Sequence, residues 1–451
     1  MKIAILAPPS DTPIIRELLS PWNVSLVEPE NAEVAINYKE KISDKKPSVI
    51  IPSESTHFEK WTKNAHIDFV NKPGQLAFVS ATPLTALSIT PKTRYCYNMP
   101  NNTAFDDNTS IDIAPEEDQV VLKFDVVNEF NSLIEGTLNP KQSKLHQLFT
   151  RLPLPYGLAP KGIRNLFLKA DKGVQNLSFC DKLPIDALRF ALVRAIEEAS
   201  GKVLEKKPVF SNNYICILTH DVETANGLQQ ARILKKVEEK YDVRSAWYVP
   251  SNRYKLNGDA LRALANHGEV GSHDTKHDGK LAHLSKEKLV QRVSDSKKTL
   301  GKITQHPIEG FRAPILQHNP TIIQALIEAG YKYDTSIPSW EPKHPYTMRP
   351  HGVGTVYPLT LNGLTEIPLT LPQDHQMLHV LELKPAEVLR SWAVMASVIR
   401  DLGGVCMFLV HPDYEFGDGK TEYYEELVSA VADDPKATVT VPSRTCSLIN
   451  E

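Results

Sequence analysis

The sequence predicts an α/β protein in two parts, a (β/α) barrel over residues 208–451 and a small α/β domain before it. After Pro208 apolar strands alternate regularly with amphipathic helices, which indicates a parallel sheet. The segment from Ser211 to Glu451 also has about the length of a barrel domain. Near the N-terminus, short apolar runs alternate with helix-like stretches, which favours a second and smaller α/β unit.

Composition and charge exclude several classes of protein. The chain has 451 residues, 41% apolar and 23% charged, as expected of a soluble globular protein. Its net charge of −3 gives no reason to expect a nucleic acid or an anionic membrane as partner, and no apolar run is long enough to span a membrane. The five cysteines show no CxxC spacing and no signal-peptide pattern is present, so we expect a cytoplasmic protein without a disulfide framework.

Residues 1–100, at the start of the chain, are predicted to form the small α/β domain. Strands are predicted at Lys2–Leu6, Val24–Val27 and Val49–Ile51, with a helix beginning near Thr12. No GxGxxG or Walker motif follows the first strand, so no nucleotide site is predicted and the role of this domain stays open.

Residues 101–207 read as a linker followed by a partly helical connecting region. Asn, Asp, Thr and Pro dominate its beginning, which is typical of a solvated linker. A strand is predicted over Val120–Phe124, and apolar residues at helical spacing predict a helix over Leu183–Ser200 that ends at Gly201.

Within the barrel, the first group with chemical potential is Asp221 and Glu223. Both follow the apolar strand that begins at Tyr214, and residues two apart in a strand share one face. Two carboxylates would then converge at a strand's carboxyl end, where barrel enzymes place catalytic groups. The alternative is that both acids cap the helix predicted over residues 228–241.

The second group is the pair His273 and His277, which follows the predicted strand Glu269–His273. Histidines four apart lie on one face of a helical turn, close enough for both rings to bind one cation. With a carboxylate as third ligand, such a site keeps one coordination position for water. The alternative is an ordinary hydrophilic turn ahead of the helix predicted over residues 285–300.

Three further ionisable residues follow predicted strands. Arg312 lies in Gly-Phe-Arg-Ala-Pro, Asp334 in Tyr-Asp-Thr-Ser and His411 in Phe-Leu-Val-His-Pro. Taken singly they could be a surface ion pair, a turn residue and a hydrogen-bonded histidine at a strand end. Their order after the carboxylates and the histidine pair gives them more weight.

Together, these five segments closely resemble the five motifs of the polysaccharide deacetylases, carbohydrate esterase family 4. Thr-His-Asp-Val-Glu, His-Asp-Thr-Lys-His and Phe-Arg-Ala-Pro carry most of the resemblance, which covers about Ser211 to Glu451. It implies a deformed (β/α) barrel. The family commonly has two adjacent aspartates in the first motif, whereas Asp221-Val222-Glu223 is similar to a DxE-type branch. Whether Asp221 or Glu223 is the carboxylate ligand is therefore left open.

The resemblance also implies roles for the site residues. Asp221 falls on the general base, and Arg312 on the arginine that holds this base. His411 looks like the general acid, and Asp334 like the acid that tunes it. The implied ligands of a divalent transition metal, zinc first and otherwise cobalt, manganese, nickel or iron, are Glu223, His273 and His277.

These roles predict a metal-dependent hydrolase that removes N-acetyl groups from a glycan or an amino-sugar precursor. A bound divalent ion would lower the pKa of its water and polarise the amide carbonyl. Two alternatives remain: hydrolysis of a small non-carbohydrate C–N amide by the same fold, and a binding or scaffold protein without turnover. The expected partner is a small-molecule or glycan substrate, and the oligomeric state is not predicted.

Overall fold

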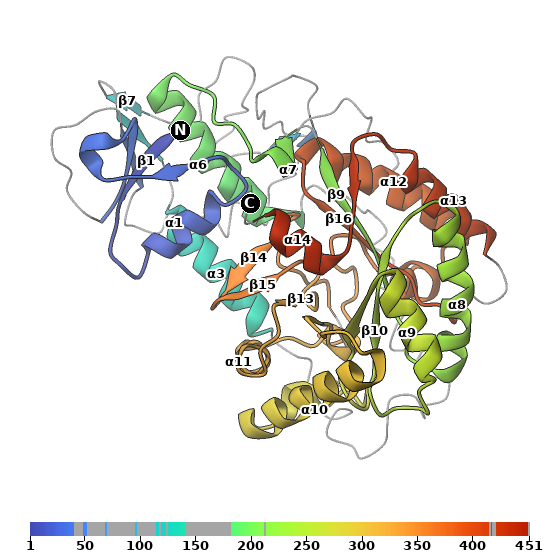
Figure 1. The fold of residues 1–451 in the computed structure, drawn as a ribbon. Coiled ribbons are helices and arrows are strands. Elements are labelled where there is room, and N and C mark those ends of the chain that lie inside the picture. The colour runs from blue at the N-terminus through green and yellow to red at the C-terminus, as the bar shows by residue number, and fades with distance from the viewer. Residues whose placement is uncertain are drawn as a thin grey trace. The chain divides into compact units, whose positions relative to one another are not determined.

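The computed structural model describes residues 1–39, 48–51, 68–69, 95–96, 114–116, 119–122, 125–140, 182–211, 213–347, 349–414, 416 and 421–449. The chain divides into two compact units (Figure 1). Unit 1 comprises Met1–Gly136 and Asn176–Ser211, and unit 2 comprises Thr137–Gln175 and Asn212–Glu451. The described parts of 101–207, predicted as a connecting region, therefore divide between the two units. The start of the predicted linker, residues 101–113, lies outside the described residues.

Unit 1 is built on a sheet in the order β2-β1-β3-β4-β8-β7, which is parallel except for the β7–β8 pair. A separate antiparallel pair joins β5 and β6. The elements are β1 (Lys2–Leu6), α1 (Thr12–Leu18), β2 (Ser25–Leu26), η1 (Pro29–Asn31), β3 (Val34–Tyr38), β4 (Ser48–Ile51), β5 (Asp68–Phe69), β6 (Tyr95–Cys96), β7 (Ala114–Glu116), β8 (Gln119–Val121), α3 (Val126–Leu138), α6 (Pro184–Ser200) and α7 (Pro208–Ser211).

The predicted helix before Gly201 is confirmed as α6, and Gly201 ends it in the left-handed conformation with φ 64°. Leu188, Leu192 and Ile196 of α6 are buried at helical spacing. The predicted strand over Val120–Phe124 is found as β8, which pairs with β4. Through this pairing β8 joins the sheet of unit 1.

Unit 2 contains a curled sheet in the order β14-β15-β13-β12-β11-β10-β9-β16, with β17 also paired to β9. Its elements are β9 (Tyr214–Asp221), α8 (Ala225–Lys240), β10 (Ser245–Val249), α9 (Gly258–His267), β11 (Glu269–Ser272), η6 (Leu281–His283), α10 (Lys286–Thr304), β12 (Gly310–Phe311), η7 (Pro314–Leu316), α11 (Pro320–Glu328), β13 (Tyr333–Asp334), β14 (Leu359–Leu361), β15 (Leu364–Glu366), the π-helix η8 (Gln376–Val380), α12 (Pro385–Leu402), β16 (Val405–Leu409), α13 (Glu422–Ala432), β17 (Ala437–Val439) and α14 (Pro442–Leu448).

The sheet of unit 2 is parallel except for the antiparallel edge strand β14. All eight residues of β9 are buried, as expected of a central parallel strand covered on both faces. Helices α8, α9, α12 and α13 lie along the outside of the strands (Figure 1). Among the described strands no ladder joins β14 to β16, so the predicted deformed (β/α) barrel is confirmed as an incompletely closed one.

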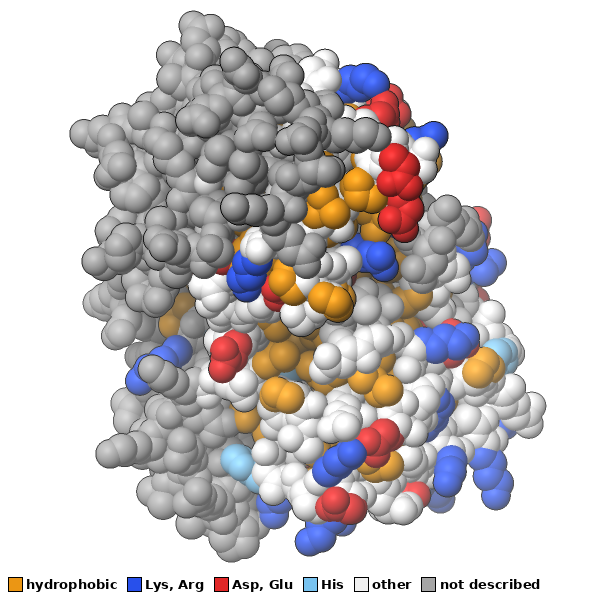
Figure 2. Space-filling model, turned by 90° about the vertical axis from the view of Figure 1, so that its left-hand side faces the viewer, with side chains coloured by type: hydrophobic (Ala, Val, Ile, Leu, Met, Phe, Trp, Pro, Cys, Tyr) orange, Lys and Arg blue, Asp and Glu red, His pale blue; other side chains and the backbone are white. Residues whose placement is uncertain are grey.

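Helices in the described ranges lack the combination of length and hydropathy that a membrane span requires. On the described part of the face in Figure 2, basic and acidic side chains are interspersed without a continuous patch of either sign. This distribution agrees with the near-balanced charge of the sequence, −3 overall.

Candidate active site

The predicted site residues follow the carboxyl ends of neighbouring parallel strands. Asp221 is the last residue of β9, and His273 and Arg312 come directly after β11 and β12. His411 comes two residues after β16, which pairs with β9. Since parallel strands end at one edge of the sheet, chain segments up to 190 residues apart in sequence reach the same place.

Asp221 and Glu223 both approach the first histidine. His273 Nε2 lies 3.8 Å from Asp221 Oδ2 and 3.9 Å from Glu223 Oε1. The helix cap is a different residue, because the Thr224 side chain accepts a hydrogen bond from the Gly227 amide at the start of α8. The two acids therefore approach the same ring, although β9 ends at Asp221 and Glu223 lies beyond the strand, and the helix-capping alternative is wrong.

The segment that carries His273 and His277 is a loop, so the predicted helical turn is wrong. Asp274 and His277 both have left-handed backbone, with φ 67° and 52°, which a helix does not allow. The loop nevertheless brings the two rings together, with centroids 4.9 Å apart.

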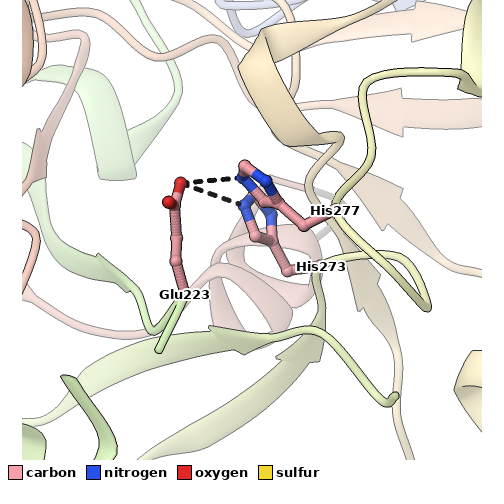
Figure 3. A group of neighbouring side chains, drawn as sticks. All are labelled: Glu223, His273 and His277. Carbon is pink, nitrogen blue, oxygen red and sulfur yellow. Dashed lines mark ion pairs between the residues drawn. The ribbon is translucent and has the colours of Figure 1, made fainter. Parts of the chain in front are cut away.

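Glu223, His273 and His277 form a group that could hold a metal ion (Figure 3). One possible ligand atom from each lies within 4.8 Å of the others. His277 Nε2 is 2.8 Å from Glu223 Oε1. Both histidine Nε2 atoms are buried, and neither has a partner with hydrogen-bond geometry. Such buried, unsatisfied polar atoms call for a binding partner.

The tautomer of His273 is set by its other nitrogen. Nδ1 lies 2.8 Å from the carbonyl oxygen of Arg312, which can only accept a hydrogen bond. Nδ1 therefore carries a proton and donates to this carbonyl, and Nε2 is the ring nitrogen that faces Glu223 and Asp221. A histidine ligand oriented by a backbone carbonyl is the usual arrangement around protein-bound metals. The residues present thus fit a divalent cation.

Arg312 is completely buried and fixes Asp221. Its Nη1 donates to Asp221 Oδ1 at 3.2 Å and to Thr219 Oγ1 at 2.9 Å. Its Nε donates to Thr335 Oγ1 at 3.0 Å, and the guanidinium lies 4.4 Å from the centroid of the Tyr248 ring. The side chain is therefore held from several strands at once, and the alternative of a surface ion pair is wrong.

The charges around Asp221 favour its ionised form. Burial alone raises the pKa of Asp221, but the positive charges of His273, Arg312 and His411 hold this pKa below its ordinary value. Asp221 is therefore a carboxylate at neutral pH, which a proton acceptor must be.

His411 is paired with Asp374, a residue that the sequence did not single out. His411 Nδ1 lies 2.6 Å from Asp374 Oδ1, and the backbone amide of His411 donates to Oδ2 at 2.7 Å. His411 Nε2 is 3.8 Å from Glu223 Oε1. Burial alone lowers the pKa of His411, but the carboxylates of Asp374, Glu223 and Asp221 raise it to about 10.

The assignment of Asp334 as the partner of His411 is therefore corrected to Asp374. Asp334 instead accepts a hydrogen bond from Ser336 Oγ at 2.6 Å and lies opposite Glu366 in the β13–β15 register. Burial raises the pKa of Asp334 to about 6 and that of Glu366 well above its ordinary value. Asp334 belongs to a buried carboxyl pair on neighbouring strands.

Sequence patterning gave little signal for Asp374. It lies eight residues beyond the end of β15 and two residues before the start of the π-helix η8. The apolar residues Leu369 and Leu371 could have marked a strand end nearby, but neither belongs to a strand in the structure.

One known family matches the part of the open barrel that carries the Glu-His-His group and Asp221. Residues 217–333 match the family model described as polysaccharide deacetylase, a range that includes Asp221, Glu223, His273, His277 and Arg312. This part of the chain is therefore similar to the polysaccharide deacetylases. No curated protein matches the chain.

Solved structures with a likeness to this chain match about half of its length. A candidate polysaccharide deacetylase from Mycobacterium smegmatis is 16% identical, with a TM-score of 0.42 over 53% of this chain and 91% of that chain. The peptidoglycan deacetylase PdaC from Bacillus subtilis is 14% identical, with a TM-score of 0.36 over 53% and 92%. A CE4 family pseudoenzyme from Bacillus anthracis is 13% identical, with a TM-score of 0.35 over 52% and 66%.

Proposed function

We propose that the chain is a metal-dependent deacetylase that hydrolyses the N-acetyl group of a glycan or an amino-sugar precursor. The observation that carries the proposal is that Asp221 and His411, which can transfer protons, both lie beside the Glu-His-His group. Asp221 Oδ2 lies 3.8 Å from His273 Nε2, and His411 Nε2 lies 3.8 Å from Glu223 Oε1. Similarity to the polysaccharide deacetylases supports acetyl groups as the substrate class.

Glu223, His273 and His277 would hold the metal. Two imidazole nitrogens and one carboxylate suit zinc and leave a coordination position open, as in catalytic sites. When bound, a divalent cation there would activate a water and polarise the substrate carbonyl. In this proposal Glu223 is the carboxylate ligand, because its Oε1 is the atom nearest His277, at 2.8 Å.

Asp221 would accept the proton of the attacking water. Its Oδ1 is occupied by the Arg312 guanidinium, which leaves Oδ2, the oxygen nearer His273, for this task. Because Arg312 is wholly buried and bonded to Thr219 and Thr335, it holds the carboxylate in one orientation. An ionised and oriented carboxylate is what a general base requires.

His411 would protonate the leaving amine. Its Nδ1 is bound by Asp374, so Nε2 is the nitrogen that faces the site and carries the proton to be donated. The Asp374 carboxylate stabilises the protonated ring. Water attack on the amide carbon, with proton transfer to nitrogen, breaks the C–N bond and yields acetate and a free amine.

The test is acetate release from short N-acetylglucosamine oligomers by the full chain loaded with zinc. We expect turnover by the wild type and a loss of about 10²-fold or more in Asp221→Asn and in His411→Ala, because each removes one proton-transfer group. A zinc-loaded wild type that releases no acetate from oligomers or from monomeric amino sugars would contradict the proposal. Equal turnover in all three proteins would contradict the assigned roles.

A further inference from the structure

The loop between β11 and η6 holds both histidines in a conformation that its own residues do not favour. Asp274 and His277, both non-glycine residues, have positive φ of 67° and 52°. Such backbone is uncommon for residues other than glycine and persists where the surroundings hold it. The contacts that hold this loop therefore decide whether the His277 ring stays beside Glu223.

Arg292 on α10 supplies four of these contacts, all to carboxylates of the loop. Its Nε donates to Asp274 Oδ1 at 2.7 Å, and its Nη2 pairs with the other oxygen, Asp274 Oδ2. The same guanidinium donates to Asp278, from Nη1 at 3.2 Å and from Nη2 at 2.7 Å. One arginine thus binds the carboxylates at positions 274 and 278, on either side of His277.

Asp274 passes this constraint to His277 directly. Its Oδ2 accepts a hydrogen bond from the His277 backbone amide at 3.2 Å. Ser296, one turn beyond Arg292 on α10, donates to the Asp274 carbonyl at 2.8 Å and lies 2.8 Å from Ser272 Oγ at the end of β11. One face of α10 therefore holds the strand end and the ligand loop together.

We propose that Arg292 is a positioning residue that sets the metal affinity of Glu223, His273 and His277. It contacts none of the three in the hydrogen bonds and ion pairs of the described residues, and it acts through Asp274 and the backbone of His277. Arginine suits this position because its planar fork bonds two carboxylates at once, which the single ammonium of lysine cannot reproduce. The inference rests on the metal site of the proposed function.

The test compares zinc affinity in the full chain, measured by competition with a chromophoric chelator after metal removal. Arg292→Lys keeps the positive charge beside buried Asp274 and removes the fork, so the chain is expected to fold. We expect its zinc dissociation constant to rise about 10- to 100-fold, the usual effect of losing an outer-shell partner. At saturation with Co²⁺, the visible absorption bands should also shift, because the position of the His277 ring changes.

Two further variants make the comparison specific. Asp278→Asn leaves the Arg292–Asp274 pair intact and should weaken zinc binding less than Arg292→Lys does. Arg262→Lys is the matched control, since Arg262 on α9 pairs with Asp259 at 2.6 Å and donates to the Ile303 carbonyl, away from the ligand loop. Its zinc affinity and Co²⁺ spectrum should equal those of the wild type.

Wild-type zinc affinity and an unchanged Co²⁺ spectrum in Arg292→Lys would overturn the inference. The failure of the proposed function has a different signature, in which the wild type binds zinc and releases no acetate while Arg292→Lys still binds zinc more weakly. A wild-type chain that binds no divalent metal would overturn both.

Discussion

At the scale of single residues, the site is organised by hydrogen bonds that leave one atom of each functional group facing the centre. His273 Nδ1 is bound to a carbonyl, His411 Nδ1 to Asp374, and Asp221 Oδ1 to Arg312. The atoms left over are two Nε2 nitrogens and Asp221 Oδ2. The outer partners therefore decide which atoms can bind metal or move protons.

The Asp374 carboxylate gives the first prediction at this scale. Asp374→Asn replaces the acceptor of His411 Nδ1–H by an amide that holds the ring less firmly and stabilises its protonated form less. We expect the rate of acetate release to fall about 10²-fold or more. Zinc content should stay at the wild-type level, because Asp374 is not among the metal-binding group. Unchanged turnover in this variant would contradict the assignment of Asp374 as the residue that supports proton donation by His411.

Some site residues could be predicted from the sequence, and others could not. Asp221, His273 and Arg312 could be predicted because each directly ends or follows an apolar strand whose direction fixes where the side chain lies. Asp374 could not, because it reaches His411 from a helical turn 37 residues earlier in the chain. The partnership of Arg292 with Asp274 likewise depends on how α10 packs, which spacing along the chain does not encode.

At the scale of elements, most strands and helices could be predicted and one local geometry could not. The strand Tyr214–Asp221 and the helix ending at Gly201 follow from apolar periodicity and a glycine cap. The spacing of His273 and His277 fits a helical turn, but residues with left-handed backbone occupy positions 274 and 277 instead. Tertiary contacts from α10 outweigh the local preference there.

The carboxyl pair between β13 and β15 predicts a pH dependence of stability. Burial raises the pKa of Asp334 to about 6, whereas the unfolded chain has the ordinary value of 3.8. Between these values the native state binds more protons, so stability should fall as pH rises from 4 to 6 and stay lower above that. The difference is at most about 3 kcal/mol, since one pKa unit corresponds to about 1.4 kcal/mol.

Asp334→Asn tests this dependence, because asparagine keeps an acceptor for Ser336 and cannot ionise. We expect the variant to lose much of the decline in unfolding free energy between pH 4 and pH 6. Urea unfolding at a series of pH values measures it. The prediction is wrong if the unfolding free energy of the wild type rises steadily between pH 4 and pH 6 and Asp334→Asn shows the same profile.

At the scale of the whole molecule, a buried polar network joins β9 and β10 to helices α8, α9 and α13. Glu238 of α8 is fully buried and accepts from Tyr424 Oη at 2.6 Å, Ser245 Oγ at 2.9 Å and His267 Nε2 at 3.1 Å. His220 Nε2 lies 3.2 Å from Glu238 Oε1, and His220 Nδ1 donates to the Val410 carbonyl at 2.9 Å. The network links the neighbours of Asp221 and His411.

Removing the centre of this network should destabilise the whole of unit 2. Glu238→Ala leaves buried donors without their acceptor, and we expect a loss of about 3–5 kcal/mol in the free energy of unfolding. Glu239→Ala is the control, because this neighbour forms a surface pair with Lys235 and is 47% exposed. Its effect should stay within about 1 kcal/mol. Equal losses in the two variants, measured by urea unfolding, would contradict the account of the network.

The most direct test of the account is the metal content of the full chain. Wild type and His273→Ala are stripped of metal, reconstituted with zinc, passed through a desalting column and analysed for zinc per chain. The account predicts about one tightly held ion in the wild type and a large loss in His273→Ala, because only two of the three ligands remain. Absence of zinc from both proteins, or equal zinc in both, would contradict the central claim.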